Sequence, residues 1–229
     1  LLGQMMKAIE KFDLSEIPHN SAEYIQLLTE IERRAFADRS DLMGDPDFMN
    51  LPVYEFMDEE YIEDRMKSFT WEEATPSSEI KPGEVIFNES DETTHFSIID
   101  KNGNAVSVTT TLNNSFGSKV YVENSGFFLN NEMDDFSSKP GFPNFFGVLG
   151  SEANSIQPGK RMLSAMTPTI VLKNNKPKLI LGSPGGPSII TSVFQTILNV
   201  IEYEMDVNEA VSAPRFHHQW YPDLSLIHI

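Results

Sequence analysis

The chain contains no cysteine among its 229 residues. Disulfide scaffolds, thiolate zinc sites, CxxC redox pairs and cysteine nucleophiles are therefore excluded. Basic residues are also scarce: 17 lysines and arginines stand against 34 aspartates and glutamates, which gives a formal net charge of −17. Binding to nucleic acid through its phosphates requires a basic surface, so this composition argues against a nucleic-acid partner.

Long apolar runs are missing as well. The most apolar stretch, residues 189 to 201, is interrupted by polar side chains and falls short of the roughly 20 apolar residues that cross a bilayer. Hydrophobic residues at 40% and charged residues at 22% are otherwise typical of a globular chain with a sizeable core. Because the chain starts at Leu1 rather than Met and shows no signal peptide, we expect it to be a fragment of a longer protein.

Residues 1 to 92 are predicted to be helical and acidic. An N-cap at Asn20 or Ser21 precedes a helical apolar stripe that reaches Ala37, and a second acidic helix fits residues 58 to 67. The stretch from 35 to 52 is rich in Asp, Gly and Pro, which break both helix and strand. It is therefore predicted to be an ordered loop with solvated charges.

From Thr93 onward the apolar period changes to two. Residues 93 to 100 and 104 to 112 flank Lys-Asn-Gly, which predicts a hairpin with a three-residue loop and Gly103 in the left-handed conformation. This register pairs apolar with apolar positions and polar with polar ones, whereas a two-residue Asn-Gly turn would mix the two faces. The preferred register places Thr111 opposite Thr93.

A second hairpin is predicted from TPTIVL and KLILG, with KNNKP between them. Gly185 and Gly186 follow, and then a helix with a buried stripe from Ile190 to Ile201 and Ser188 as its cap. A glycine pair at a helix start can bind an oxyanion through unpaired N–H groups, but it is also typical of a tight turn without a ligand.

Other candidate residues leave two interpretations open. Thr93 and Thr111 could carry a nucleophile, although strand threonines mostly reflect β-propensity. The acidic residues 130 to 135 lack EF-hand spacing and fit either a solvated turn or recognition of an ammonium group. His217 and His218 are adjacent, so on a strand they point to opposite faces and cannot chelate one ion, and no metal site is expected.

Taken together, five blocks in order resemble the γ-glutamyltransferases, also called glutathione hydrolases. The resemblance covers nearly the whole chain except its last residues, LSLIHI. The blocks that carry it are TTHFSIIDKNGNAVSVTTTLNNSFG, SGFFLNNEMDDFSSKPGFPN, PGKRMLSAMTPTIV, LGSPGGPSIIT and APRFHHQWYPD.

The resemblance implies an α+β fold, part of the αββα four-layer sandwich of N-terminal nucleophile hydrolases. Such precursors cut themselves into two subunits, here between Glu92 and Thr93. Residues 1–92 would then be the C-terminal part of the large subunit, and residues 93–229 the small catalytic subunit, truncated at its C-terminus. An exported location, periplasmic or extracellular, is also implied, with the signal peptide in the missing N-terminal part.

The family's chemistry implies a role for each matching residue. After cleavage, the α-amino group of Thr93 acts as base for its own hydroxyl, which attacks the γ-glutamyl amide of glutathione or a related compound. Thr111 orients this nucleophile, and the N–H groups of Gly185 and Gly186 bind the oxyanion. Water, an amino acid or a dipeptide accepts the glutamyl group, and no cofactor is needed. The residues implied for donor binding are Asn113, Glu132 and Asp135 at the α-ammonium and Ser164 at the α-carboxylate.

Two departures from the family pattern concern donor binding. The family's Ser-Ser pair is Ser164-Ala165 here, and Phe146 stands where lid-bearing relatives often have Tyr. The family's carboxylate-binding arginine lies upstream of this chain. Two alternatives remain open, namely a related N-terminal nucleophile acylase of the cephalosporin acylase kind and an inactive paralogue that binds γ-glutamyl peptides.

Overall fold

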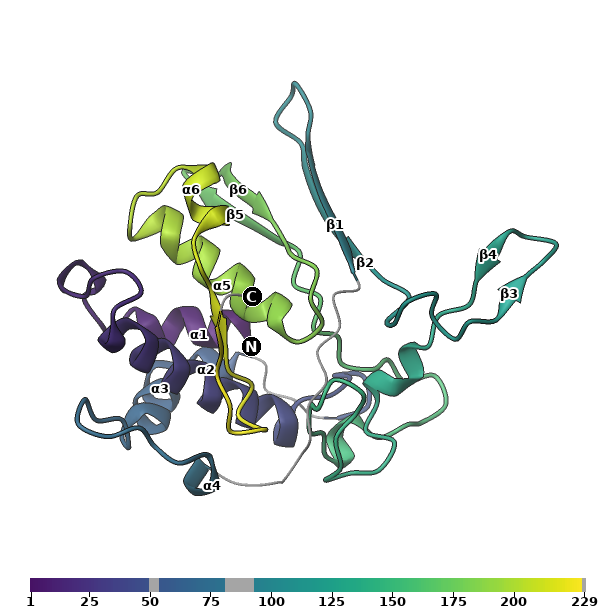
Figure 1. Ribbon diagram of the computed structural model, residues 1–229, viewed down its shortest axis with the longest axis horizontal. Coiled ribbons are helices and arrows are strands. Elements are labelled where there is room, and N and C mark those ends of the chain that lie inside the picture. The colour runs from purple at the N-terminus through teal and green to yellow at the C-terminus, as the bar shows by residue number, and fades with distance from the viewer. Residues whose placement is uncertain (50–53, 81–92, 228–229) are drawn as a thin grey trace.

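The structure is a computed structural model that describes residues 1–49, 54–80 and 93–227. The helices are α1 (Leu2–Ile9), α2 (Ala22–Leu42), α3 (Glu59–Met66), α4 (Ser77–Ile80), α5 (Ser188–Ile201) and α6 (Val207–Ser212). The strands are β1 (Thr94–Ile99), β2 (Ala105–Thr110), β3 (Tyr121–Val122), β4 (Phe127–Phe128), β5 (Thr169–Lys173), β6 (Lys176–Leu181), β7 (Phe216–His217) and β8 (Leu226–Ile227). Along the chain, helices α1 to α4 come first, strands β1 to β6 follow as hairpins, and α5, α6 and the paired strands β7 and β8 come last (Figure 1).

Helix α2 is longer than the sequence predicts. It begins at the predicted cap, because the Ser21 hydroxyl accepts a hydrogen bond from the Tyr24 N–H at 3.2 Å, but it ends at Leu42 instead of near Ala37. The predicted loop from 35 to 52 is therefore wrong over its first eight residues. Three of its charged side chains are not solvated, since Asp38, Arg39 and Asp45 are buried, whereas Asp41 and Asp47 are exposed as predicted. Packing and ion pairing outweigh the low helix propensity of this stretch.

The helical core is built by α1, α2 and α5 (Figure 1). Their apolar faces meet around Phe36 and Phe194, and Phe216 and Trp220 from the C-terminal segment close the same core. Each of these four side chains is at most 2% exposed. The core therefore joins residues on both sides of the predicted cleavage point.

The β1–β2 hairpin has the predicted register. His95 pairs with Thr109 and Phe96 with Val108, and Gly103 has a φ of +85° in the three-residue loop. The Asp100 N–H donates to the Asn104 carbonyl at 3.0 Å, which closes this loop. The two-residue alternative is excluded. The last ladder pair is Thr94 with Thr110, so the same register continued by one residue places Thr111 across from Thr93.

The two main hairpins lie against each other through the polar face of β1–β2. The hydroxyls of Ser97 and Ser107 donate to the carbonyls of Ile180 and Leu181 in β6, both at 3.0 Å. On the other side of β5–β6, α5 contributes Ile189 and Val193 to a second apolar cluster with β-strand residues. The layers thus run helix, hairpin, hairpin, and the apolar outer face of β1–β2 is exposed.

Two local predictions near β5–β6 are corrected. The connection between the strands is a two-residue turn, Asn174-Asn175, with both φ angles positive, and not the five-residue KNNKP loop. Ser188 is the first helical residue of α5 and not its cap. Its hydroxyl donates backwards to the Gly185 carbonyl at 2.8 Å, so it stiffens the glycine turn instead.

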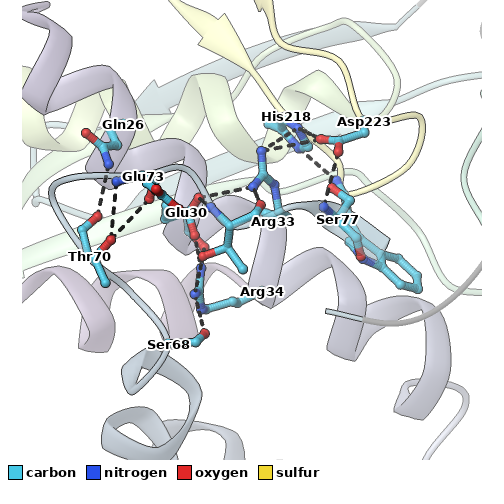
Figure 2. Close-up of polar contacts among 12 residues, drawn as sticks. Gln26, Glu30, Arg33, Arg34, Ser68, Thr70, Glu73, Ser77, His218 and Asp223 are labelled. Carbon is cyan, nitrogen blue, oxygen red and sulfur yellow. Dashed lines mark hydrogen bonds and ion pairs between the residues drawn. The ribbon is translucent and has the colours of Figure 1, made fainter. Parts of the chain in front are cut away.

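A buried polar network, which we call the α2 network, centres on Glu30 (Figure 2). Its carboxylate pairs with both Arg33 and Arg34 and accepts the Thr75 N–H at 2.8 Å. Arg33 also donates to the Thr75 carbonyl, and Arg34 donates to the Ser68 hydroxyl at 2.7 Å. The irregular segment from 68 to 77 is thereby attached to α2.

The α2 network also reaches the C-terminal segment of the chain (Figure 2). Arg33 lies 3.4 Å from one carboxylate oxygen of Asp223, and the other oxygen accepts the Ser77 N–H at 3.1 Å. The backbone N–H of His218 donates to the Glu32 carboxylate at 3.0 Å. Charged and polar groups that would be costly to bury alone therefore satisfy one another across the two predicted subunits.

We expect stability to fall at acidic pH through His218. Burial, followed by the nearby Arg33 charge, lowers the pKa of His218 to about 4, against about 6.5 in an unfolded chain. The unfolded state binds the proton more readily, so this stabilisation is complete above about pH 6.5 and is lost as the pH falls toward 4. The drop in urea midpoint between pH 7 and pH 4.5 should be smaller in His218→Gln than in the wild-type protein. An equal drop in both would contradict the prediction.

Candidate active site

Thr93 lines a cavity of about 30 Å³ at the open end of the β1–β2 hairpin. Most of the residues predicted from the sequence meet there, although they come from segments far apart in the chain. The lining includes Thr93, Thr111, Asn113, Asp135, Ser164, Ala165 and Gly186. Gly185 and Glu132 are not among its lining residues: Gly185 directly precedes Gly186, and Glu132 lies three residues before Asp135. Glu92 lies outside the described residues.

Thr111 connects the nucleophile candidate with the next site residue. The hairpin register places it across from Thr93, and its hydroxyl oxygen accepts the Asn113 N–H at 2.9 Å. Asn113 is buried with a φ of +76°, and its side-chain amide donates to the Asn131 carbonyl at 3.2 Å. This chain of contacts holds the Thr93 end of the hairpin close to the acidic segment.

The glycine pair has the backbone geometry of a tight turn before α5. Gly185 and Gly186 have φ angles of +120° and +54°, values that side-chain-bearing residues rarely adopt. Among the described residues, neither glycine N–H donates to an acceptor, whereas both carbonyls accept from the first turn of α5. Two unpaired N–H donors at a helix start match the requirements of an oxyanion site, and Gly186 lines the same cavity as Thr93.

The acidic segment forms a short 3₁₀ helix, η3 (Glu132–Asp135). One carboxylate oxygen of Glu132 is buried and has no hydrogen-bond partner within the described part of the chain. Burial raises the pKa of Glu132, and burial together with the Glu132 charge raises the pKa of Asp135 to about 7. Asp135 lines the cavity and Glu132 lies three residues before it, and two desolvated carboxyls this close together favour a cationic ligand over a solvated turn.

The family-model comparison matches residues 1–228 to "Gamma-glutamyltranspeptidase". The chain belongs to the gamma-glutamyltranspeptidase family. It is 48% identical over 220 residues to the glutathione hydrolase proenzyme of Escherichia coli K12, a match that covers 96% of this chain and 38% of that relative. The chain thus spans well under half the length of this curated relative.

Solved structures place the fold. A gamma-glutamyltranspeptidase mutant from Helicobacter pylori is 61% identical, with a TM-score of 0.58. The match covers 58% of this chain and 72% of the Helicobacter pylori chain. A cephalosporin acylase from Bacillus halodurans is 21% identical with a TM-score of 0.72 over 95% of this chain and 36% of its own. The predicted α+β fold of N-terminal nucleophile hydrolases is thereby confirmed.

The departures from the gamma-glutamyltranspeptidase family pattern both lie at the cavity. Ser164 and Ala165 line it side by side, and the Ser164 hydroxyl accepts the Met166 N–H at 3.0 Å. Phe146 is buried against Gly186, where an added Cβ would meet its ring at 3.1 Å. The Gln219 side chain donates to the Phe146 carbonyl at 3.2 Å and holds this wall in place.

The sequence reasoning missed one charged residue of this cavity. Arg39, from the last turn of α2, lines the cavity together with Thr93 and Asp135. The signal was present, because Arg39 follows Leu28 by three helical turns and so continues the buried face of α2. Ending the predicted helix near Ala37 concealed it.

The described part of the chain contains neither a metal-binding cluster nor a membrane-spanning helix. No group of three or more His, Asp or Glu side chains is arranged to hold a metal ion there. None of the described helices is long and apolar enough to span a membrane.

Proposed function

We propose that the full-length protein is a self-processing N-terminal threonine hydrolase and transferase acting on γ-glutamyl amides such as glutathione. The observation that carries this proposal is the convergence of Thr93, Thr111, Gly186 and Asp135 on one cavity. Residues 1–92 would belong to the large subunit and residues 93–229 to the small one, with the cut between Glu92 and Thr93. No organic cofactor takes part in this chemistry.

The proposed reaction uses Thr93 as both nucleophile and base. Its α-amino group, with a reference pKa of about 7.7–8.0, takes the hydroxyl proton while the oxygen attacks the γ-carbonyl carbon. The N–H groups of Gly185 and Gly186 stabilise the resulting oxyanion. The C–N bond then breaks, the departing amine takes the proton, and a glutamyl ester remains on Thr93.

The second half of the reaction reverses these roles. Water, or the amine of an amino acid or dipeptide, gives its proton to the Thr93 amine and attacks the ester. Release of the acyl group regenerates the hydroxyl, with glutamate or a new γ-glutamyl amide as product. Thr111 would orient the nucleophile throughout.

Recognition of the donor would depend on its amino acid head group. Asn113, Asp135 and Ser164 line the cavity, and Glu132 has a buried carboxylate oxygen without a partner in the described part of the chain. Asn113, Glu132 and Asp135 would bind the α-ammonium, and Ser164 would contact the α-carboxylate. We expect periplasmic or extracellular exposure for the processed protein, as the family resemblance implies.

Two anilide donors that differ by one group test this proposal. γ-Glutamyl anilide carries the α-ammonium, and glutaryl anilide lacks it. We expect kcat/KM to favour γ-glutamyl anilide by at least about 100-fold. The glutaryl compound has no ammonium group, so it leaves the desolvated carboxyls of the site without a partner. A preference for glutaryl anilide would support the acylase alternative, and turnover of neither would support the inactive paralogue.

The Ala165→Ser variant tests the missing hydroxyl at the carboxylate end. We expect KM for γ-glutamyl anilide to fall by about tenfold with kcat unchanged, because a hydrogen bond to a charged group contributes about 1.5 kcal/mol or more. Ser164→Ala is the matched control and should raise KM. A gain confined to kcat in Ala165→Ser would contradict this assignment.

A further inference from the structure

Arg39 is a buried guanidinium that faces the cavities at the candidate active site. It is 9% exposed and lines both the Thr93 cavity and an adjoining cavity of about 110 Å³. Asp135 lines the same two cavities. The two side chains therefore lie on a shared wall, although one comes from α2 and the other from η3.

Unlike its neighbours on α2, Arg39 is not used by the surrounding structure. The guanidinium groups of Arg33 and Arg34 both pair with Glu30. Within the segments that the structure describes, Arg39 forms no such salt bridge, and burial lowers its pKa while the Asp135 charge opposes that shift. Burying a charged guanidinium without a paired anion costs free energy, so the position of Arg39 at a cavity indicates a role there.

The segments that carry Arg39 and Asp135 are joined through a short 3₁₀ helix, η4 (Glu152–Asn154), and its N-cap, Ser151. The Ser151 hydroxyl donates to the carbonyl of Asp41, two residues after Arg39, and the Asn154 amide donates to the Asp135 carbonyl, each at 2.7 Å. The end of α2 and the backbone of Asp135 are therefore both attached to η4.

The charges around Asp135 are unbalanced without Arg39. Glu132 and Asp134 lie on the same short helix, and Lys139 and Arg39 line the larger cavity together with Asp135. Burial and the Glu132 charge raise the pKa of Asp135, and Arg39 acts against both. Only the ionised carboxylate can pair with an ammonium group, so Asp135 needs this compensation to bind one near neutral pH.

We infer that Arg39 is a positioning residue that holds Asp135 as an anion facing the α-ammonium of the donor. It acts through Asp135 and touches no reacting atom. With Glu132 and Asp135 ionised and Arg39 charged, these three side chains together carry one net negative charge, which one ammonium neutralises. This inference rests on the proposed function.

The test compares Arg39→Gln and Arg39→Lys with the wild type in the full-length protein, using γ-glutamyl anilide between pH 5.5 and 8.5. In Arg39→Gln we expect the acid limb of kcat/KM to move up by about one pH unit, which corresponds to an about tenfold higher KM on that limb. We expect kcat to change less than about twofold, and Arg39→Lys to restore most of the acid limb because it keeps the charge. An unmoved acid limb in Arg39→Gln would overturn the inference.

A double-mutant cycle with Asp135→Asn separates this role from simple structural support. In the Asp135→Asn background, Arg39→Gln should raise KM no further. An equal loss in both backgrounds would show that Arg39 acts independently of Asp135 and would overturn the inference. Calorimetric binding of L-glutamate, which carries the same head group, should show the same pH shift without requiring turnover. Absence of turnover in the wild type would count against the proposed function, whereas wild-type turnover with an unmoved Arg39→Gln profile would count only against Arg39.

Discussion

Replacing Thr93 with Ala is expected to leave the full-length precursor uncut and to lower γ-glutamyl turnover by a factor of about 10⁴ or more. Two functions are lost together in this variant. The hydroxyl that attacks the donor is absent, and without cleavage the α-amino group that would act as its base is never released. Thr93→Ser, which keeps the hydroxyl, should retain both cleavage and measurable turnover.

Intact mass and N-terminal sequencing after incubation measure the first part of this prediction. The wild-type precursor should yield a chain that begins Thr-Thr-His-Phe. Thr94→Ala is a matched control, because Thr94 is exposed and its side chain points to the opposite face of the strand from Thr93. Cleavage of Thr93→Ala at the same position, or a complete, folded wild-type precursor that stays uncut, would refute the role of Thr93.

Replacing Glu30 with Gln is expected to lower the free energy of unfolding by about 3–5 kcal/mol. Glu30 is 1% exposed and is the shared anion of Arg33 and Arg34, which are 6% and 2% exposed. The neutral amide leaves two buried guanidinium groups without a counter-charge. It also weakens the attachment of Thr75 to α2.

Urea unfolding of the full-length protein measures this effect. Glu10→Gln provides the control, because Glu10 pairs with Lys7 at the same i,i+3 spacing but both side chains are at least half exposed. Exposed pairs contribute little, so the control should leave the urea midpoint nearly unchanged. Similar losses in the two variants would show that burial of the α2 network is not what makes Glu30 important.

The local structure of the β-rich half could be predicted because its determinants are local. Alternation of polar and apolar side chains fixes which face of a strand is buried, and the Lys-Asn-Gly loop fixes the register. These two signals predict Thr111 opposite Thr93 from local sequence alone, without any tertiary contact. The strand-to-helix turn at Gly185 and Gly186 was identified for the same reason, since positive φ angles favour glycine.

The length of α2 and the fate of its charges could not be predicted in this way. Asp, Gly and Pro in the stretch from 35 to 52 signal a loop, but the signal is only a local preference. Asp45 is buried because Arg161, far along the chain, donates to it from both backbone and side chain. No pattern within a short window contains that partner.

The sequence by itself determined the hairpin register, the glycine turn and the residue types that the family resemblance assigns to the site. Each of these depends on chemistry within a few neighbouring residues. Only the tertiary structure decided that Arg39 shares the cavity with Thr93 and Asp135, and that Glu30 and Glu32 join α2 to the C-terminal segment. Those contacts arise from packing of distant segments around a common core, where the cost of burying a charge is offset by partners that sequence spacing does not reveal.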